Sequence, residues 1–351
     1  MPTFSHEYLR KVSYEIFKAA GTPDDAAQDV AEGLISSNLA GHDSHGVGQV
    51  PVYVDRIKAG HIIPDAPYVV EKETPTTAVI NGNWGFGFAV TKRATQTLIE
   101  KALAQNVAAV TIYRQSHIGR LTPYAAMCAE QGLAAIMFTD SGRGPKAVAP
   151  FGGRGRRLGT NPVCICVPSN EDSPVFIDMA SSAVAAGKLA VYRRRNLPIP
   201  TGWIIDKDGN DTTDPNAYNE GGALLPVGGD LGYKGYGLSF MGEVFSGILT
   251  TLGFGLDPEG KHNDGSFIAA WRIDAFADLA WFKQEVSDFI AFIKTSPLAA
   301  GSPGILYPGE AEKHTEAKLR VEGIAVEDSV WSDLTGIMQE YGLESLVGEP
   351  F

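Results

Sequence analysis

Short apolar runs alternate with longer helical patterns from about residue 76 onward, and this alternation limits the possible folds more than any other feature of the chain. The runs TTAVING, VAAVTIY and AAIMFTD have the length and composition of buried strands. Between the first two stands AVTKRATQTLIEKALAQN, whose apolar residues recur at helical spacing. NPVCICVPS and SPVFIDMA add two more strand patterns, so the middle of the chain is predicted to have an α/β fold.

The two ends of the chain are predicted to be helical. We expect a first helix from about Ser5 to Ala20, and a second that has Thr22 as N-cap and Pro23 at its first position. Helical patterns return after about residue 290, and KGYGLSFMGEVFSGILTTL reads as a buried helix before that. The expected division is a helical segment over residues 1–75, an α/β domain over 76–290, and a helical segment over 291–351 that packs with the first.

The balance of charge excludes some classes of partner. The formal net charge of −12 argues against nucleic acid and against anionic membranes, because both attract basic surfaces. No apolar run reaches the roughly 18 residues that a membrane span requires. The cysteines Cys128, Cys164 and Cys166 are too few for a disulfide framework, and the last two share one face of a predicted strand. A cytoplasmic location fits these features.

The pattern of glycines argues against the common nucleotide-binding folds. A Rossmann fold needs G-x-G-x-x-G where a strand meets a helix, and a phosphate loop needs G-x-x-x-x-G-K-[ST]. The chain has 40 glycines, but GFGFAV, GGRGRRLG and GFGLDPEG all break the required spacing. If a dinucleotide binds, it binds on another scaffold.

A polar cluster, GHDSHG, follows the second predicted helix. Its glycines favour a loop, and a histidine on such a loop can exchange a proton near neutral pH. His42 and His45 have a spacing that could also hold a metal ion, although a third ligand is missing. A serine hydrolase would pair Ser44 with His45, but adjacent residues do not face each other on a helix, and the chain has no G-x-S-x-G elbow.

A second candidate acid/base residue is His117, in RQSHIGRL. It follows a predicted strand, and side chains at strand ends often build the sites of α/β proteins. The plain alternative for His45 and His117 is that each satisfies a buried carbonyl group. Two histidines on separate polar, glycine-flanked loops leave the two interpretations about equally supported.

Six motifs, in this order, resemble the type 2 malate/L-lactate dehydrogenase family over nearly the whole chain: GHDSHGVGQVP, SHIGRL, APFGGRGRRLGTNP, FIDMASSAVAAGK, GYKGYGL and LYPGE. The first and third look most like the hydroxycarboxylate dehydrogenase B branch. The resemblance implies that NAD or NADP binds to a non-Rossmann α/β domain. The sheet would be mixed and rich in antiparallel pairs, and the terminal segments would form a helical domain. It also implies a homodimer, no metal, and hydride transfer between a 2-hydroxy acid and a 2-oxo acid.

The resemblance also assigns roles to single residues. His45 would be the acid/base, Ser44 would orient it, and His117 would be the second candidate. The residues expected to bind substrate are Gln49, Thr160, Arg120 and Lys188. The residues expected to bind the cofactor are His45, His117, Gly119, Arg120, Leu121, Ile177, Asp178, Met179, Ala180, Lys234, Pro308, Gly309 and Glu310.

Two positions depart from the family pattern. Many members carry an arginine four residues after the catalytic histidine as a clamp for the substrate carboxylate, and here that position is Gln49. The cyclic imino-acid reductases of the family place an acidic residue where this chain has Lys188, which favours oxo-acid chemistry. The alternative functions are therefore a cyclic imino-acid reductase, a metal-assisted hydrolase built on the loop histidines, or a ligand-binding relative without activity.

Overall fold

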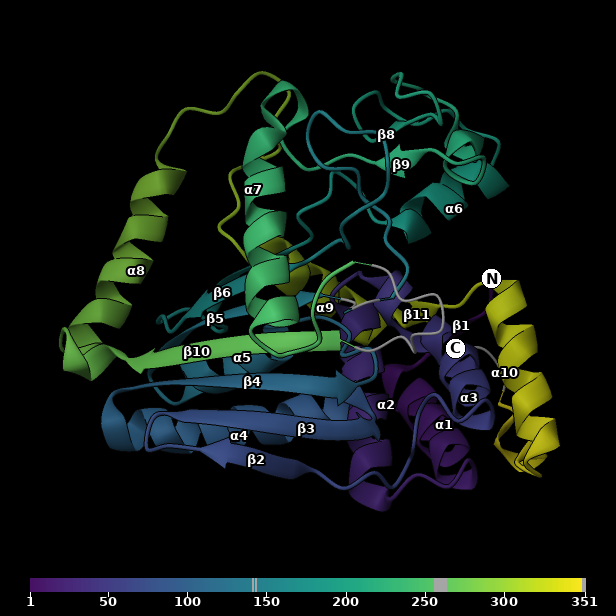
Figure 1. Ribbon diagram of the computed structural model, residues 1–351, viewed down its shortest axis with the longest axis horizontal. Helices are drawn as coiled ribbons and strands as arrows, with labels where there is room; N and C mark the ends of the chain where they lie inside the picture. The colour runs from purple at the N-terminus through teal and green to yellow at the C-terminus, as the bar shows by residue number, and fades with distance from the viewer. Residues whose placement is uncertain (141, 143, 256–263, 349–351) are drawn as a thin grey trace.

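The computed structural model describes residues 1–140, 142, 144–255 and 264–348. At its centre lies a seven-stranded sheet with the order β2-β3-β4-β10-β5-β6-β7 (Figure 1). Its strands are β2 (Val69–Glu73), β3 (Thr77–Gly85), β4 (Val107–Gln115), β5 (Leu133–Asp140), β6 (Val163–Val167), β7 (Val175–Met179) and β10 (Asp264–Arg272). β3 and β4 run parallel, and every other neighbouring pair in this sheet is antiparallel. The predicted α/β class and the mixed, mostly antiparallel sheet are confirmed.

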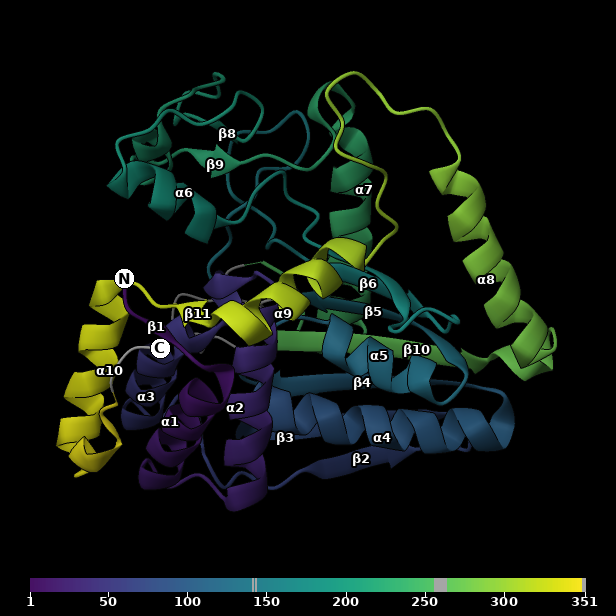
Figure 2. The same cartoon turned by 180° about the vertical axis from the view of Figure 1, so that it is seen from behind.

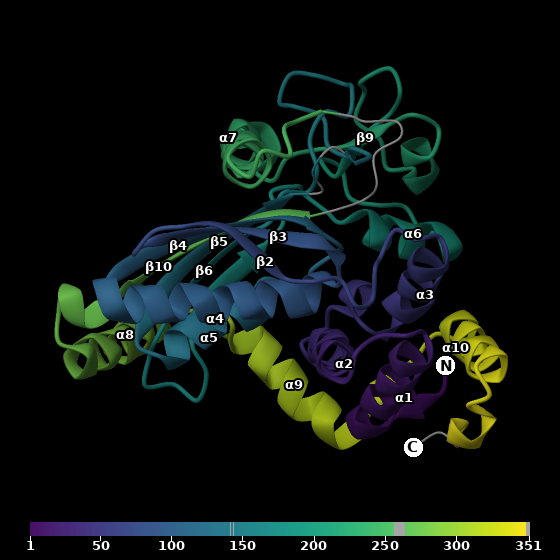
Figure 3. The same ribbon diagram turned by 60° about the horizontal axis from the view of Figure 1, so that its bottom comes forward.

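Helices cover the two faces of the sheet unequally. Helices α4 (Gly87–Gln105) and α5 (Thr122–Glu130) lie against one face, and α7 (Tyr233–Gly242) stands over the other (Figure 3). α4 buries Ala94, Leu98 and Ala102 beneath the sheet, because these residues recur every three to four positions. They pack with apolar strand residues such as Ile112 and Met137.

A smaller lobe contains α6 (Ala186–Arg194) and the short strand pair β8 (Ile204–Ile205) and β9 (Ala223–Leu224). At the far end of the sheet, α8 (Leu279–Lys294) extends away from the rest of the chain (Figure 1). No helix among the described residues is long and apolar enough to cross a membrane.

The two ends of the chain share one hydrophobic core. Strand β1 (Thr3–Phe4) pairs with β11 (Ile324–Ala325), and both termini lie at the same end of the molecule (Figure 2). The helices at this end are α1 (His6–Ala19), α2 (Asp24–Leu39), α3 (Val50–Lys58), α9 (Glu310–Glu322) and α10 (Asp328–Glu340). Residues as distant as Phe17, Val54 and Leu334 are fully buried in this core. α2 also contacts α4, which brings this core against the sheet.

The start of the second helix differs from the prediction. Pro23, and not Thr22, is the N-cap of α2, and the hydroxyl of Thr22 is buried without a hydrogen-bond partner. The backbone N–H of Thr22 donates to the carbonyl of Phe17, and Gly21 has a φ of 90°. These are the features of a glycine-centred helix C-cap. Thr22 therefore closes α1 instead of opening α2.

The prediction of a buried helix at KGYGLSFMGEVFSGILTTL is wrong for the single chain. α7 continues into a wider π-helical turn at Glu243–Ile248, and large apolar side chains project from both parts. Tyr233 is 52% exposed, Phe240 51% and Ile248 50%. The helix is apolar as predicted, but nothing in the described chain covers this face.

Candidate active site

Polar residues gather where several strands of the sheet begin or end at one edge. Gln115 ends β4 and faces Asp264, the first residue of β10. Asp140 ends β5 and faces Gly265, the next residue of β10. The chain leaves β4 along this edge and carries His117, and the N–H of Ile118 donates to the Asp264 carboxylate at 3.0 Å. The antiparallel pairing thus places His117, Asp264 and Asp140 along one edge.

The loop that carries His45 is held by a side chain from the preceding helix. Two 3₁₀ turns, Asp43–His45 and Val47–Gln49, form the loop. The Asn38 amide donates to Asp43 at 2.7 Å, and its oxygen accepts from the N–H of Val47 at 2.8 Å. A Cβ at Gly46 would lie 2.2 Å from this oxygen, so the close contact requires glycine. The loop is held in place before any ligand binds.

The two candidate histidines lie side by side. Their ring centroids are 5.4 Å apart with planes inclined by 31°, although they are 72 residues apart in the chain. The Ser44 hydroxyl lies 2.9 Å from Nδ1 of His45. Adjacent side chains do not face each other on an α-helix, but residues 43–45 form a 3₁₀ turn, in which Ser44 and His45 do meet. Ser44 can therefore orient the His45 ring, as the resemblance implied.

The surroundings of His45 favour its neutral form. The ring is half-buried, and burial is the main cause that lowers its pKa; the nearby His42 lowers it further. Asp178 and Asp264 act in the opposite direction. A neutral imidazole can accept a proton, and a protonated one with a lowered pKa donates readily.

The structure adds a residue that the sequence analysis missed. Tyr53, from α3, places its hydroxyl 2.6 Å from Nδ1 of His117. The tyrosine is buried at 1% exposure among Phe17, Phe86 and Phe88. No local signal pointed to this contact, because a lone tyrosine at a helical position reads as core and its partner lies 64 residues away.

Gln49 supports the loop from within. Its side-chain amide donates to the carbonyl of Ser44 at 2.8 Å. The residue at the expected clamp position thus ties together the loop that holds His45.

The segment after His117 is pinned by a carboxylate. Asp178, near the end of β7, accepts from the N–H groups of Leu121 and Thr122 and from the Thr122 hydroxyl, all at 2.8–2.9 Å. Arg120 donates to the carbonyl of Ser36 at 3.3 Å, while its Nε is buried without a partner. Gly119 has a φ of 73° and packs closely on Phe88. Asp178, Leu121 and Arg120, all expected to bind the cofactor, lie close together, and the Leu121 N–H already has Asp178 as its acceptor.

Residues 308–310 lie against the same strand. The N–H of Phe176, in β7, donates to the carbonyl of Pro308 at 3.3 Å. A Cβ at Gly309 would lie 2.7 Å from the Phe176 ring. Glu310 accepts from the Tyr307 N–H at 3.0 Å and from Lys294. Beside them Ile177 and Met179 are each 37% exposed, and Ala180 is partly exposed.

Three predicted residues lie apart from the histidines in the contacts described. Lys188 is exposed and sits over the Trp203 ring at 5.3 Å. Lys234 is exposed on α7, and the carbonyl of Thr160 accepts from Ser181. α6 nevertheless reaches the loop, because a Cβ at Gly187 would lie 3.4 Å from the Cβ of Ser44.

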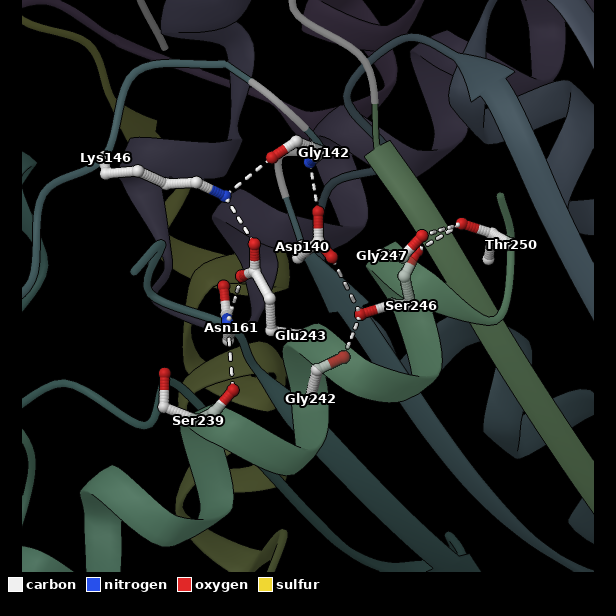
Figure 4. A network of polar contacts seen from close by, with 10 residues as sticks. All are labelled: Asp140, Gly142, Lys146, Asn161, Ser239, Gly242, Glu243, Ser246, Gly247 and Thr250. Carbon is white, nitrogen blue, oxygen red and sulfur yellow. Dashed lines mark hydrogen bonds and ion pairs between the residues drawn. The ribbon is translucent and has the colours of Figure 1, made fainter. Parts of the chain in front are cut away.

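A buried polar network, which we call the lysine network, occupies the same edge of the sheet (Figure 4). The Lys146 side chain is 1% exposed, and its amine donates to Glu243 at 2.9 Å and to the carbonyl of Gly142 at 2.6 Å. Asn161 donates to Glu243 and to the carbonyl of Ser239, both at 3.0 Å. Asp140 accepts from the Gly142 N–H and from Ser246. Burial, with the Glu243 charge, raises the pKa of Asp140 to about 7. None of this was predicted from the sequence.

The described residues contain no group of three or more His, Cys, Asp or Glu side chains that could hold a metal ion. His42 instead lies 3.7 Å from Glu312 of α9.

Comparison with known proteins places the chain in a family. The family model for malate/L-lactate dehydrogenase matches residues 4–335. The chain belongs to this family. A malate/(S)-sulfolactate dehydrogenase of Methanothermus fervidus is 36% identical over 97% of this chain and 98% of its own. The hydroxycarboxylate dehydrogenase B of Escherichia coli O157:H7 is 33% identical over 97% of this chain and 94% of its own.

The fold agrees with this assignment. A malate dehydrogenase of Entamoeba histolytica superposes with a TM-score of 0.92 at 30% identity, and the match covers 99% of each chain. The likeness in sequence and in fold thus extends over nearly the whole chain.

Proposed function

We propose that this chain is an NAD(P)-dependent dehydrogenase that interconverts a 2-hydroxy acid and a 2-oxo acid, with His45 as the acid/base. The observation that carries the proposal is the meeting of His45 and His117, from two separate loops at the sheet edge, with ring centroids 5.4 Å apart. Malate, lactate and sulfolactate, for which its relatives are named, are all 2-hydroxy acids. Hydroxycarboxylate dehydrogenase B, the branch suggested by two of the motifs, is also among the relatives.

The residues beside the histidines suit a dinucleotide. The end of β7 and residues 308–310 lie together and offer two partly exposed apolar side chains, Ile177 and Met179, against which a flat ring can pack. The exposed amine of Lys234 suits a phosphate group. The missing G-x-G-x-x-G motif and the mostly antiparallel sheet support a non-Rossmann site. When bound, the nicotinamide supplies the hydride.

His45 would supply the proton. In reduction, its imidazolium donates to the carbonyl oxygen as that oxygen gains charge, and Ser44 holds the ring at Nδ1. In oxidation, the neutral ring takes the hydroxyl proton. Because the pKa of His45 is lowered, the neutral form dominates at pH 7. Reduction should therefore become faster as the pH falls toward that pKa, and oxidation should not.

The substrate carboxylate needs a cation, because Gln49 carries no charge. Arg120 suits this role best, since its guanidinium is partly buried near the loop and its Nε has no partner. Thr160 and Lys188 remain further candidates.

Assembly and location complete the proposal. A homodimer would cover the exposed apolar side chains of α7 and of α8, where Phe289 is 62% and Phe292 69% exposed. A cytoplasmic location is supported by the three buried free thiols. The division into segments 1–75, 76–290 and 291–351, the second binding the cofactor, is proposed on the shared core of the two ends.

The test is to follow the absorbance of NADH and NADPH with a panel of 2-oxo acids, and with cyclic imino acids as the competing substrates. We expect turnover of at least one oxo acid, undiminished by a chelator. Turnover of imino acids alone would replace the proposal with an imino-acid reductase. Loss of activity on chelation would point to a metal-dependent enzyme.

A further inference from the structure

The contact between Tyr53 and His117 constrains where the His117 proton can sit. The hydroxyl and Nδ1 are 2.6 Å apart, so one of the two atoms must donate. Tyr53 is buried among three phenylalanines, and burial raises its pKa far above the ordinary value. The phenol therefore keeps its proton, and that proton needs an acceptor.

His117 supplies that acceptor. Among the described residues, Nδ1 of His117 is the one hydrogen-bond partner found for the Tyr53 hydroxyl. If Nδ1 carried a proton and donated to Tyr53, the phenol proton would be left unpaired in an apolar core, at a cost of about 1–3 kcal/mol. Nδ1 is therefore unprotonated, and the neutral ring carries its proton on Nε2.

We propose that Tyr53 is a positioning residue that fixes the Nε2-protonated tautomer of His117. This inference rests on the proposed function for its catalytic consequence. With Nδ1 engaged by Tyr53, His117 acts as a neutral hydrogen-bond donor toward the substrate oxygen, and His45 is left as the residue that gives and takes the reaction proton. The two imidazoles then have different roles despite their contact.

Charged and titratable groups from several elements lie near His45 or Tyr53. His42 lies on the same loop as His45, Asp264 lies at the start of β10, and Asp178 lies at the end of β7. Arg56 acts on Tyr53 from within α3. None of these groups provides the Tyr53 hydroxyl with a second hydrogen bond in the part of the chain that is described.

The first test is a ¹⁵N NMR measurement on the full-length protein with ring-labelled histidine. The His117 signals are identified by their loss in His117→Asn. We expect one unprotonated nitrogen, Nδ1, and one protonated nitrogen, Nε2. A protonated Nδ1 in the neutral ring would overturn the proposal. This measurement does not depend on turnover, so it is independent of whether the proposed function holds.

The second test is Tyr53→Phe, which removes one oxygen and keeps the ring. We expect a mixture of His117 tautomers and a kcat about tenfold lower, with KM for the cofactor unchanged. The matched control is Tyr124→Phe, because the buried Tyr124 hydroxyl donates to the backbone carbonyl of Ile118 at 2.7 Å and does not touch the ring. The control should keep both the tautomer and kcat within about twofold.

The two variants distinguish a specific effect of Tyr53 on the His117 tautomer from the general effect of losing a buried hydroxyl. If Tyr53→Phe leaves the His117 tautomer unchanged, or if Tyr124→Phe disturbs it equally, Tyr53 does not fix the proton and the proposal is wrong. If the tautomer changes as expected but the wild-type protein reduces no oxo acid, the positioning role stands and the proposed function fails.

Discussion

Two polar regions lie at the same edge of the sheet and are held in different ways. In the histidine pair, each Nδ1 has a neighbouring hydroxyl, from Ser44 or Tyr53, and the two rings are half-buried. In the lysine network, Lys146 and Glu243 have side chains only 1% and 8% exposed, and each makes several polar contacts. The Lys146–Glu243 ion pair is thus buried and fully engaged in contacts within the chain, whereas the histidine rings stay partly accessible.

The difference separates reactivity from stability. A buried ion pair costs several kcal/mol when one partner is removed, because the other charge loses its compensation. A half-buried histidine contributes less to stability than such an ion pair, but it can exchange a proton. We therefore expect changes at the histidines to reduce catalysis and changes in the lysine network to reduce stability.

The largest expected effect is on catalysis. His45→Ala should lower kcat by about 10²- to 10⁴-fold, because general acid catalysis is lost. The melting temperature and the affinity for the cofactor should stay near the wild-type values. Steady-state kinetics and thermal unfolding of the same preparation check both halves of this expectation. A melting temperature far below the wild-type value would show that His45 has a structural role. The histidine pair and the lysine network would then not differ in the way proposed.

The next effect is on stability. Lys146→Met should lower the free energy of unfolding by about 3–5 kcal/mol, because Glu243 and Asp140 then share a buried site without their cation. Urea unfolding followed by circular dichroism measures it. The control is Lys146→Met combined with Glu243→Gln, which removes both charges and should recover most of the loss. An unchanged stability in Lys146→Met would contradict the structural role of the network.

Local sequence patterns predicted the helices and strands better than they predicted the contacts of the histidine pair and of the lysine network. The helix expected at AVTKRATQTLIEKALAQN is α4, and VAAVTIY is β4, because apolar spacing reports directly on burial. The prediction of Thr22 as the N-cap of α2 was wrong, because the N–H of Thr22 takes part in the C-cap of α1. His45 and His117 were singled out from their polar loops, and the resemblance suggested roles that remain predictions.

Contacts between distant segments were out of reach. Lys146 and Glu243 are 97 residues apart, and Tyr53 and His117 are 64 apart. No spacing rule relates such positions, because the pairing of antiparallel strands brings them together only after the sheet has formed. Phe240 on α7 was expected to be buried for a related reason: its apolar pattern does not show whether another segment of the chain packs on it.

A third effect is the pH dependence of stability. The pKa of Asp140 is raised from 3.8 to about 7 in the folded protein, so its folded form holds a proton that the unfolded chain has lost. The contribution of this proton to the free energy of unfolding is complete below pH 4 and is lost as the pH rises to 7. The slope is at most about 1.4 kcal/mol per pH unit. Asp140→Asn should remove this fall, and urea titrations of both proteins between pH 4 and 8 compare them. If the free energy of unfolding falls with pH equally in the wild type and in Asp140→Asn, Asp140 is not the group responsible.

The smallest effect concerns the substrate clamp. Gln49→Arg should lower KM for an anionic oxo acid by about two- to fivefold, the range of a partly exposed ion pair. Gln49→Leu is the control, because it removes the bond to the Ser44 carbonyl without adding charge and should lower kcat modestly. If KM is unchanged in Gln49→Arg, this position does not face the carboxylate, and Arg120 becomes the stronger candidate.

The most direct test of the account is a crystal structure of the protein with NAD(P) and a non-reactive oxo-acid analogue. The account predicts that a ring nitrogen of His45 lies about 2.6–3.2 Å from the carbonyl oxygen of the analogue, with the nicotinamide on the opposite side of that carbon. It would be contradicted by a complex in which His45 points away from the analogue and a carboxyl group of the lysine network lies against the reacting oxygen.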